Sequence, residues 1–445
     1  MDEHSFHYHL NEAPPFFKNL AYGLQWIIVT IPSIIVFSAL GSAALHLDPA
    51  GHVSFSQRLL LMTGLMTLLQ SLKGHRLPIV EGPSSALVLT FIILAPGGLP
   101  AIEGGLIIGG LLLVAIGAFR WFRWLSTFFT PNVVGVILIL VPTTLLPFIT
   151  PMLIGVGETS PNGNVGVWGI SLFVIIWVSL LSNWLRGFFQ TTAMLAGIVL
   201  GFLFFFIQGK VSMTMVKEAS WFALPSPLLG EWPSFSISTI LPFLFTYLAV
   251  MINTVGSIQG VSEMVTKENL ENRIHRGIAF TGLSGMASAC LGVMGMVSHA
   301  TSPGVILISR VASRYVLTMS GIIMVFCAFL PKLWAFLAAI PLSVIASVLF
   351  VIFASQFIAG INTIMTDKKK IERREYFTVG LPILLGASVS LLPKPFLQLF
   401  PSSLASVFGN GLVVGILSSL LCEHLFFRKG KNGPVPVIKP SNRRD

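Results

Sequence analysis

Long apolar runs recur along the whole chain and are separated by short polar loops. A helix needs about 20 apolar residues to cross a hydrocarbon core of about 30 Å. Runs of about this length cover residues 17–45, 55–73, 101–121, 131–150, 166–185, 188–208, 238–262, 276–295, 316–331, 335–359, 376–392 and 398–426. The pattern predicts a chain that crosses a membrane many times as α-helices.

Two shorter apolar runs, 77–95 and 297–313, are interrupted by glycine and proline. Each begins with an extended-looking stretch, continues through a Gly/Ser/Pro cluster, and ends as a short apolar helix. Proline suits the first turn of a helix, because the N–H group that it lacks would be unpaired there. We therefore expect each run to contain a short strand followed by a half-helix, and the half-helices to begin at Pro83 and Pro303.

The broken runs are the third and tenth of fourteen predicted spans, so they lie seven spans apart. That spacing favours two inverted seven-span repeats whose half-helices meet near the middle of the membrane. Gly82 and Ser302 are the expected caps, and the helix starts would point at a shared cavity. The alternative is a pair of proline-kinked helices with no site between them. It is less favoured, because irregular backbone at membrane depth normally lines a cavity.

Composition makes lipid the expected solvent. Only 10% of the 445 residues are charged, 54% are hydrophobic and the mean hydropathy is +0.85. A soluble chain carries about 25% charged residues, which cover its surface. The fold class that we predict is an all-α integral membrane protein, embedded in the lipid bilayer through fourteen transmembrane segments.

The net charge of +10 reflects topology rather than nucleic-acid binding. Most of the 27 Lys and Arg residues fall in the tail and in the short loops that a fourteen-span chain places on the same side as both termini. Basic loops remain cytoplasmic, so we expect both termini in the cytoplasm and a multi-pass protein of the inner membrane. Because these residues are scattered over short loops, no phosphate-binding face is predicted.

No motif indicates an enzyme, a cofactor or a metal. The sequence has no His-Glu-x-x-His, no Gly-x-Ser-x-Gly and no phosphate loop. Its three cysteines lie in apolar runs without metal-ligand spacing. The terminal cluster of His4, His7, His9 and Glu12 is interpreted as a flexible polar end rather than as a metal site.

Several stretches resemble the bacterial uracil permeases, within the xanthine/uracil permease (nucleobase–ascorbate transporter) family. They include Ser220-Trp-Phe-Ala-Leu-Pro-Ser-Pro, Val255-Gly256 and Gly304-Val-Ile-Leu-Ile-Ser-Arg310. The resemblance implies a proton-coupled nucleobase symporter that works by alternating access, often as a homodimer.

The resemblance also implies a division into two domains. A core domain would comprise residues 1–125 (spans 1–4) and 236–334 (spans 8–11). A gate domain would comprise 126–235 (spans 5–7) and 335–428 (spans 12–14). Residues 429–445 would form a cytoplasmic tail.

Mapped onto this chain, the family's binding positions lack their usual carboxylates. Asn253 stands at the family's eighth-span glutamate, and Ser257 stands four residues later. The remaining substrate-binding positions that the resemblance implies lie in spans one, three and ten: Gln25, Ser84, Ser85, His299, Ala300, Thr301 and Ser302.

Glu81 is the acid nearest to this predicted site. An ionisable group inside a membrane segment is a functional candidate by default. One hypothesis is that Glu81 carries the coupled proton. The other is that it is paired structurally with Arg76 or Lys73.

Two functions follow from these residues. The first is a symporter for nucleobases, uracil or xanthine-like. The alternative is an anion transporter of the sulfate or bicarbonate type, which shares this architecture. A site without carboxylates between two helix N-termini would suit an anion.

Overall fold

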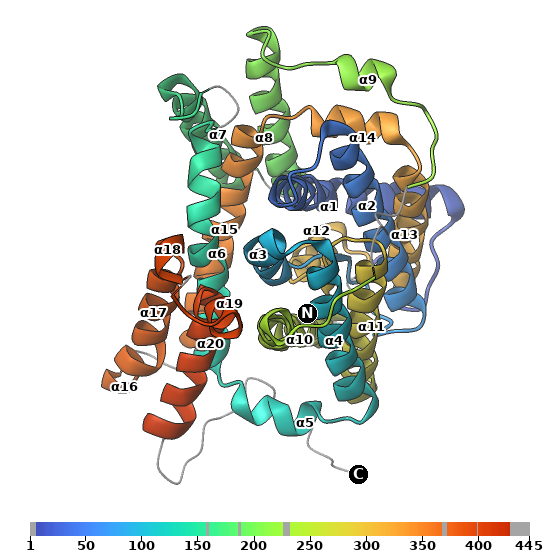
Figure 1. The fold of residues 1–445 in the computed structure, drawn as a ribbon. Coiled ribbons are helices and arrows are strands. Elements are labelled where there is room, and N and C mark those ends of the chain that lie inside the picture. The colour runs from blue at the N-terminus through green and yellow to red at the C-terminus, as the bar shows by residue number, and fades with distance from the viewer. Residues whose placement is uncertain are drawn as a thin grey trace.

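The computed structural model describes residues 6–156, 160–185, 188–225, 232–366, 372–397 and 399–427. The predicted tail, 429–445, lies outside these ranges. Helices make up most of the chain (Figure 1). In chain order the elements are α1 Phe16–Ala44, α2 Pro49–Leu72, β1 Glu81–Pro83, α3 Ser85–Leu94, α4 Leu99–Ala118, α5 Phe122–Leu125, α6 Pro131–Leu153, α7 Val165–Trp184, α8 Phe188–Ile207, α9 Thr214–Glu218, α10 Ile237–Val265, α11 Leu270–Cys290, β2 Met296–Ser298, α12 Ser302–Ser309, α13 Arg314–Ala328, α14 Pro331–Ala338, α15 Leu342–Ile364, α16 Arg373–Glu375, α17 Leu381–Val389, α18 Lys394–Leu397, α19 Ser402–Phe408 and α20 Gly411–Leu421.

Within the described ranges, six helices are long and apolar enough to cross a membrane. They are α1, α4, α6, α7, α10 and α15. The pair α13 and α14 would add a seventh, but the two helices meet at 84°. The protein is therefore a multi-pass membrane protein, and the count of fourteen spans stays a prediction.

Two further helices are long but carry many polar side chains, because other helices cover them. Along α2, for example, Gln57, Thr63, Thr67 and Gln70 are all buried. α2 packs against α13 and α1, and α11 packs against α4 and α10. Since these helices face protein more than lipid, they need not be apolar throughout.

The eleventh and twelfth predicted runs divide differently in the structure. α13 ends at Ala328, and Pro331 begins the separate short helix α14. Pro341 then caps α15, which starts at Leu342 rather than near residue 335. Prolines favour the first turn of a new helix over the middle of a continuing one, so these two prolines place both breaks.

The prediction of a strand and a half-helix in each broken run is confirmed. β1 precedes the ten-residue helix α3, and β2 precedes the eight-residue helix α12. The two strands pair antiparallel, with Glu81 opposite Ser298 and Pro83 opposite Met296. The pairing gives the backbone groups of both breaks partners inside the protein, as a membrane environment requires.

The predicted helix starts and caps were wrong by one or two residues. Pro83 belongs to β1, and Ser84 caps α3 by accepting a hydrogen bond from the Leu87 N–H group. In α12 the cap is Thr301, with Ser302 inside the first turn. Both prolines lie next to a break. The pairing of β1 with β2 determines the residue at which the extended backbone ends and the helix begins.

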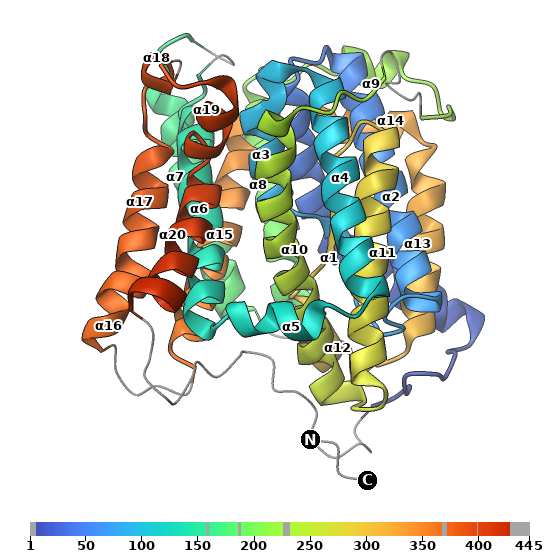
Figure 2. The same cartoon turned by 60° about the horizontal axis from the view of Figure 1, so that its bottom comes forward.

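The helices form two groups that lie side by side (Figures 1 and 2). In one group, α11 packs on α4, α13 on α2, and α10 on α4. In the other, α15 packs on α6, α17 on α20, and α7 on α8. α10 also contacts α19 and α20, so it lies at the boundary between the groups.

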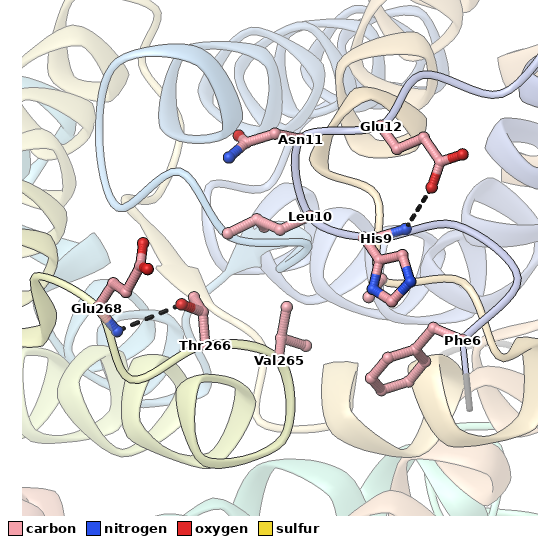
Figure 3. Close-up of a pocket in the computed structure, with 9 residues that line it drawn as sticks. Phe6, His9, Leu10, Asn11, Glu12, Val265, Thr266 and Glu268 are labelled. Carbon is pink, nitrogen blue, oxygen red and sulfur yellow. Dashed lines mark hydrogen bonds between the residues drawn. The ribbon is translucent and has the colours of Figure 1, made fainter. Parts of the chain in front are cut away.

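The N-terminal segment from Phe6 onward is attached to the protein, contrary to the expectation of a flexible end. Tyr8 forms a parallel bridge with Val311, and the Ala312 N–H group donates to the Tyr8 carbonyl at 2.9 Å. A polar pocket lies between this segment and the end of α10, lined in part by His9, Glu12 and Glu268 (Figure 3). The described part of the chain contains no cluster of three His, Cys, Asp or Glu side chains that could hold a metal ion.

Gly82 permits the close approach of the His299 ring to β1. A Cβ atom at this position would lie 2.6 Å from Cε1 of His299.

We expect Gly82→Ala to destabilise the protein by about 1–3 kcal/mol, because overpacking forces the ring or the strand to move. Thermal unfolding in detergent measures this effect. Gly169→Ala on α7 is the control, since a Cβ there meets nothing within 4 Å; equal melting temperatures for the two variants would contradict the argument.

Candidate functional site

The candidate site lies where α10 passes the paired strands and the starts of α3 and α12. α10 contacts β2, α3 and α12. On α10, Asn253, Gly256, Ser257 and Gly260 are spaced so that they share one face of the helix. One helix face is therefore directed at both places where a strand leads into a half-helix, β1–α3 and β2–α12.

The Ser257 side chain forms its hydrogen bonds within the protein. Its side chain is buried, and Oγ lies 2.8 Å from the Ser298 carbonyl and 2.9 Å from the Asn253 carbonyl, both of which can accept its hydrogen. The bond to Ser298 joins α10 to β2 at the strand crossing. The shared face thus looks toward the breaks, as the i, i+4 spacing predicts.

Asn253 is the polar side chain on this face that remains available. It is half-buried, and none of the described residues hydrogen-bonds to its amide. Next to it, Gly256 is exposed, and a Cβ there would meet nothing within 4 Å. An amide offers two N–H donors and one carbonyl acceptor, so Asn253 can bind a small polar molecule in this open space.

The start of α12 contributes exposed backbone. Ala300 and Thr301 are both exposed, as is Gly304. Ser302 has a structural role instead: its Oγ accepts from the Val80 N–H group and donates to the His299 carbonyl at 2.8 Å. Of the predicted positions here, Ala300 and Thr301 therefore face open space, and Ser302 does not.

At the start of α3, Ser84 is buried and Ser85 half-buried. The Ser84 N–H group donates to the Gly295 carbonyl and its Oγ caps α3, so Ser84 holds the backbone in place. His299 is half-buried, its N–H group pairs with the Val80 carbonyl at 3.0 Å, and its ring lies against Gly82. Its imidazole is thereby fixed beside the strand crossing.

Gln25 lies on α1, which contacts both α3 and β1. Its side chain is half-buried, and it forms no hydrogen bond with any residue that the structure describes. The neighbouring Trp26 is buried. Gln25 and Asn253 are thus the two predicted site residues whose amides are both partly accessible and unpartnered.

Glu81 is buried, and neither of the partners considered from the sequence binds it. Instead, Oε1 accepts a hydrogen bond from Ser298 Oγ at 2.7 Å and lies 3.3 Å from Nε2 of His75. The Glu81 N–H group donates to Thr67 Oγ1 at 3.1 Å. Arg76 and Lys73 are both exposed, whereas Glu81 points into the protein.

Several buried ionisable groups were not identified from the sequence, among them His75, Arg58 and Glu103. His75 lies in a polar loop sequence, where a histidine carries no signal of its own. Arg58 on α2 is fully buried, and its Nη1 donates to the Leu291 carbonyl. Glu103 on α4 is also buried, and it lowers the cost of burying the Arg58 charge. An acid inside the apolar run 101–121 is a signal that could have revealed Glu103.

The chain is similar in sequence to nucleobase permeases and similar in fold to an anion transporter. The chain is 26% identical to the uric acid permease PucJ of Bacillus subtilis, over 93% of this chain and 94% of that protein. It is also 26% identical to the uracil permease of Escherichia coli, over 91% and 92%. Its fold is similar to the transmembrane domain of the bicarbonate transporter BicA from a cyanobacterium, with a TM-score of 0.55 at 11% identity, covering 91% and 96% of the two chains.

The model of the permease family that includes the xanthine and uracil permeases matches residues 17–394, which is most of the chain. Members of this family are transporters and not enzymes. By this match, and by the strand and half-helix breaks around one polar face of α10, the chain belongs to the xanthine/uracil permease family.

Proposed function

We propose that this protein transports a nucleobase, uracil or an oxidised purine such as xanthine or uric acid. The observation that carries the proposal is the unpartnered Asn253 amide beside the starts of two half-helices. A nucleobase presents N–H and C=O groups along one edge, and a single amide can pair with both kinds of group. Exposed backbone at Ala300 and Thr301 would complete the binding surface.

The relatives support this class without selecting one base. Identity to a uric acid permease and to a uracil permease is the same, 26%. A purine and a pyrimidine are both planar and share the alternation of N–H and C=O groups. The residues that distinguish them would be those around Asn253, including Gln25 and Ser85, because these side chains are partly accessible.

An anion is the second candidate, since similar folds occur in anion transporters such as BicA. Helix N-termini bind anions well. At 11% identity that similarity concerns the fold alone. Family membership and the amide at Asn253 favour the nucleobase.

The two groups of helices support a mechanism in which one group moves against the other. In this proposal the core domain is 1–125 with 236–334, the gate domain is 126–235 with 335–428, and the fourteen spans form two inverted repeats. The antiparallel pairing of β1 with β2 is the contact expected between such repeats. Both termini would lie in the cytoplasm, in the inner membrane, and a homodimer remains a prediction.

We further propose that transport is proton symport through Glu81, in the absence of a carboxylate at Asn253. Glu81 accepts a hydrogen bond from the Ser298 side chain, and the Ser298 carbonyl accepts one from Ser257 on the site face of α10. This short chain connects the acid to the site. A proton on Glu81 would weaken the hydrogen bond that Ser298 donates to the carboxylate, and so affect the residues that hold the base.

Uptake into proteoliposomes tests the substrate class. We expect labelled uracil, xanthine or uric acid to accumulate when the outside is more acidic than the lumen. Bicarbonate and sulfate serve as the competing substrates. Accumulation of an anion without any of the three bases would contradict the proposal and favour the second candidate.

Replacing Asn253 tests the site. Asn253→Ala should weaken binding of the base by about 1–3 kcal/mol, because the hydrogen-bonding groups of the base lose their partner. Equilibrium binding measures the change. Ser262→Ala, at the far end of the same helix, is the control. Unchanged binding by Asn253→Ala would remove this residue from the site.

Replacing Glu81 tests the coupling. Glu81→Gln keeps the size of the side chain but cannot take up a proton. We expect it to retain exchange of base across the membrane and to lose accumulation driven by a pH gradient. Accumulation at the rate of the unmodified protein would make Glu81 a structural residue.

A further inference from the structure

His75, the partner of Glu81, is held in one protonation state by the surrounding backbone. The ring is fully buried at the end of α2. Its Nδ1 lies 3.0 Å from the Leu77 backbone nitrogen, which always donates. Nδ1 must therefore be an acceptor without a proton, so the ring proton resides on Nε2 and is directed at Glu81 Oε1, 3.3 Å away.

The backbone of His75 is fixed on two further sides. Its N–H group donates to Gln70 Oε1 at 3.2 Å, and Gln70 Nε2 in turn donates to the Gly277 carbonyl. The His75 carbonyl accepts from Arg273 Nη1 at 2.9 Å. α2 and α11 therefore both hold the His75 backbone, and turning the ring about its side-chain bonds would break its contacts with Leu77 and Glu81.

Charged side chains also lie near the His75 backbone. Arg273, which donates to the carbonyls of His75 and Arg76, lies with Arg76 on the cytoplasmic side by the predicted topology. Burial, and then Arg314, lower the pKa of Arg273, whereas Glu268 raises it. His299 lies close enough to Glu81 to interact with its charge. The side chains around His75 therefore include the bases Arg273 and Arg76 and, beyond Arg273, the acid Glu268, so the neutral state of the ring rests on the hydrogen bond that Nδ1 accepts from Leu77.

The two oxygens of Glu81 have different surroundings. Oε1 accepts from both His75 and Ser298. Oε2 is buried, and no described group hydrogen-bonds to it. A proton that reaches the pair can bind at Oε2 without displacing an existing hydrogen bond.

We propose that His75 is a positioning residue that stays neutral, occupies Oε1 of Glu81 and leaves Oε2 as the atom that takes up and releases the transported proton. This inference rests on the proposed role of Glu81. Hydrogen bonds to a carboxylate favour its charged form. His75 therefore promotes release of the proton, which a carrier needs as much as uptake.

Two variants separate this role from simple packing. His75→Leu fills a similar volume but donates no hydrogen bond, whereas His75→Gln keeps a donor and an acceptor and never gains a charge. Without the donor, the protonated form of Glu81 is favoured and persists to higher pH. We expect the external pH of half-maximal accumulation to rise by roughly one to two units in His75→Leu, the shift that corresponds to one hydrogen bond to a charged group.

In His75→Gln the same midpoint should stay near that of the unmodified protein, because the amide replaces the donor. Exchange of base at constant pH reports that each variant is folded. His9→Leu, which replaces an exposed histidine, is the control. A large shift in His75→Gln comparable to that in His75→Leu would indicate that His75 itself titrates, and would overturn the proposal.

Measuring the single variant Glu81→Gln in the same assay distinguishes failure of this inference from failure of the proposed coupling. If Glu81→Gln alone still accumulates base, the proton carrier has been misassigned. If Glu81→Gln abolishes accumulation but His75→Leu leaves the midpoint unchanged, Glu81 is the carrier and the positioning role of His75 is wrong.

Discussion

The antiparallel pairing of β1 with β2 is the interaction on which the rest of the structure depends. Two apolar runs of this membrane protein are broken, and each break exposes backbone groups that need partners inside the protein. The strands satisfy one another across the break, with Gly82 opposite Val297. Because the pairing holds both half-helix starts in one place, it also creates the position at which a polar solute can meet two helix N-termini.

In the proposed mechanism, the same pairing also connects the acid to the site. Glu81 lies opposite Ser298 in the ladder, so their side chains fall on the same side and hydrogen-bond at 2.7 Å. The Ser298 carbonyl is then free to accept from Ser257 on α10. A shift of one residue in register would place Glu81 on the opposite face and break this connection. Strand register therefore links a buried acid to a helix face through two hydrogen bonds of Ser298.

The features that could be predicted from the sequence are those that depend on nearby residues, such as glycine, proline and residue spacing. Glycine and proline indicated both breaks, and the i, i+4 spacing predicted that Asn253 and Ser257 share a face directed at them. Features that depend on long-range contacts were missed. Ser302 was expected as a cap, but its hydroxyl is used by Val80 across the strand pair. Burial of His75 arises from packing of α2 against α11, which no single segment encodes.

In the proposed mechanism the base binds where β1 and β2 pair, against the open face of α10. An experimental structure of the protein with xanthine, uric acid or uracil bound tests it most directly. We expect the base between the starts of α3 and α12, with one edge within about 3 Å of the Asn253 amide, the usual length of a hydrogen bond. A base bound in the pocket beside His9 and Glu12, or elsewhere with Asn253 unengaged, would rule out this site.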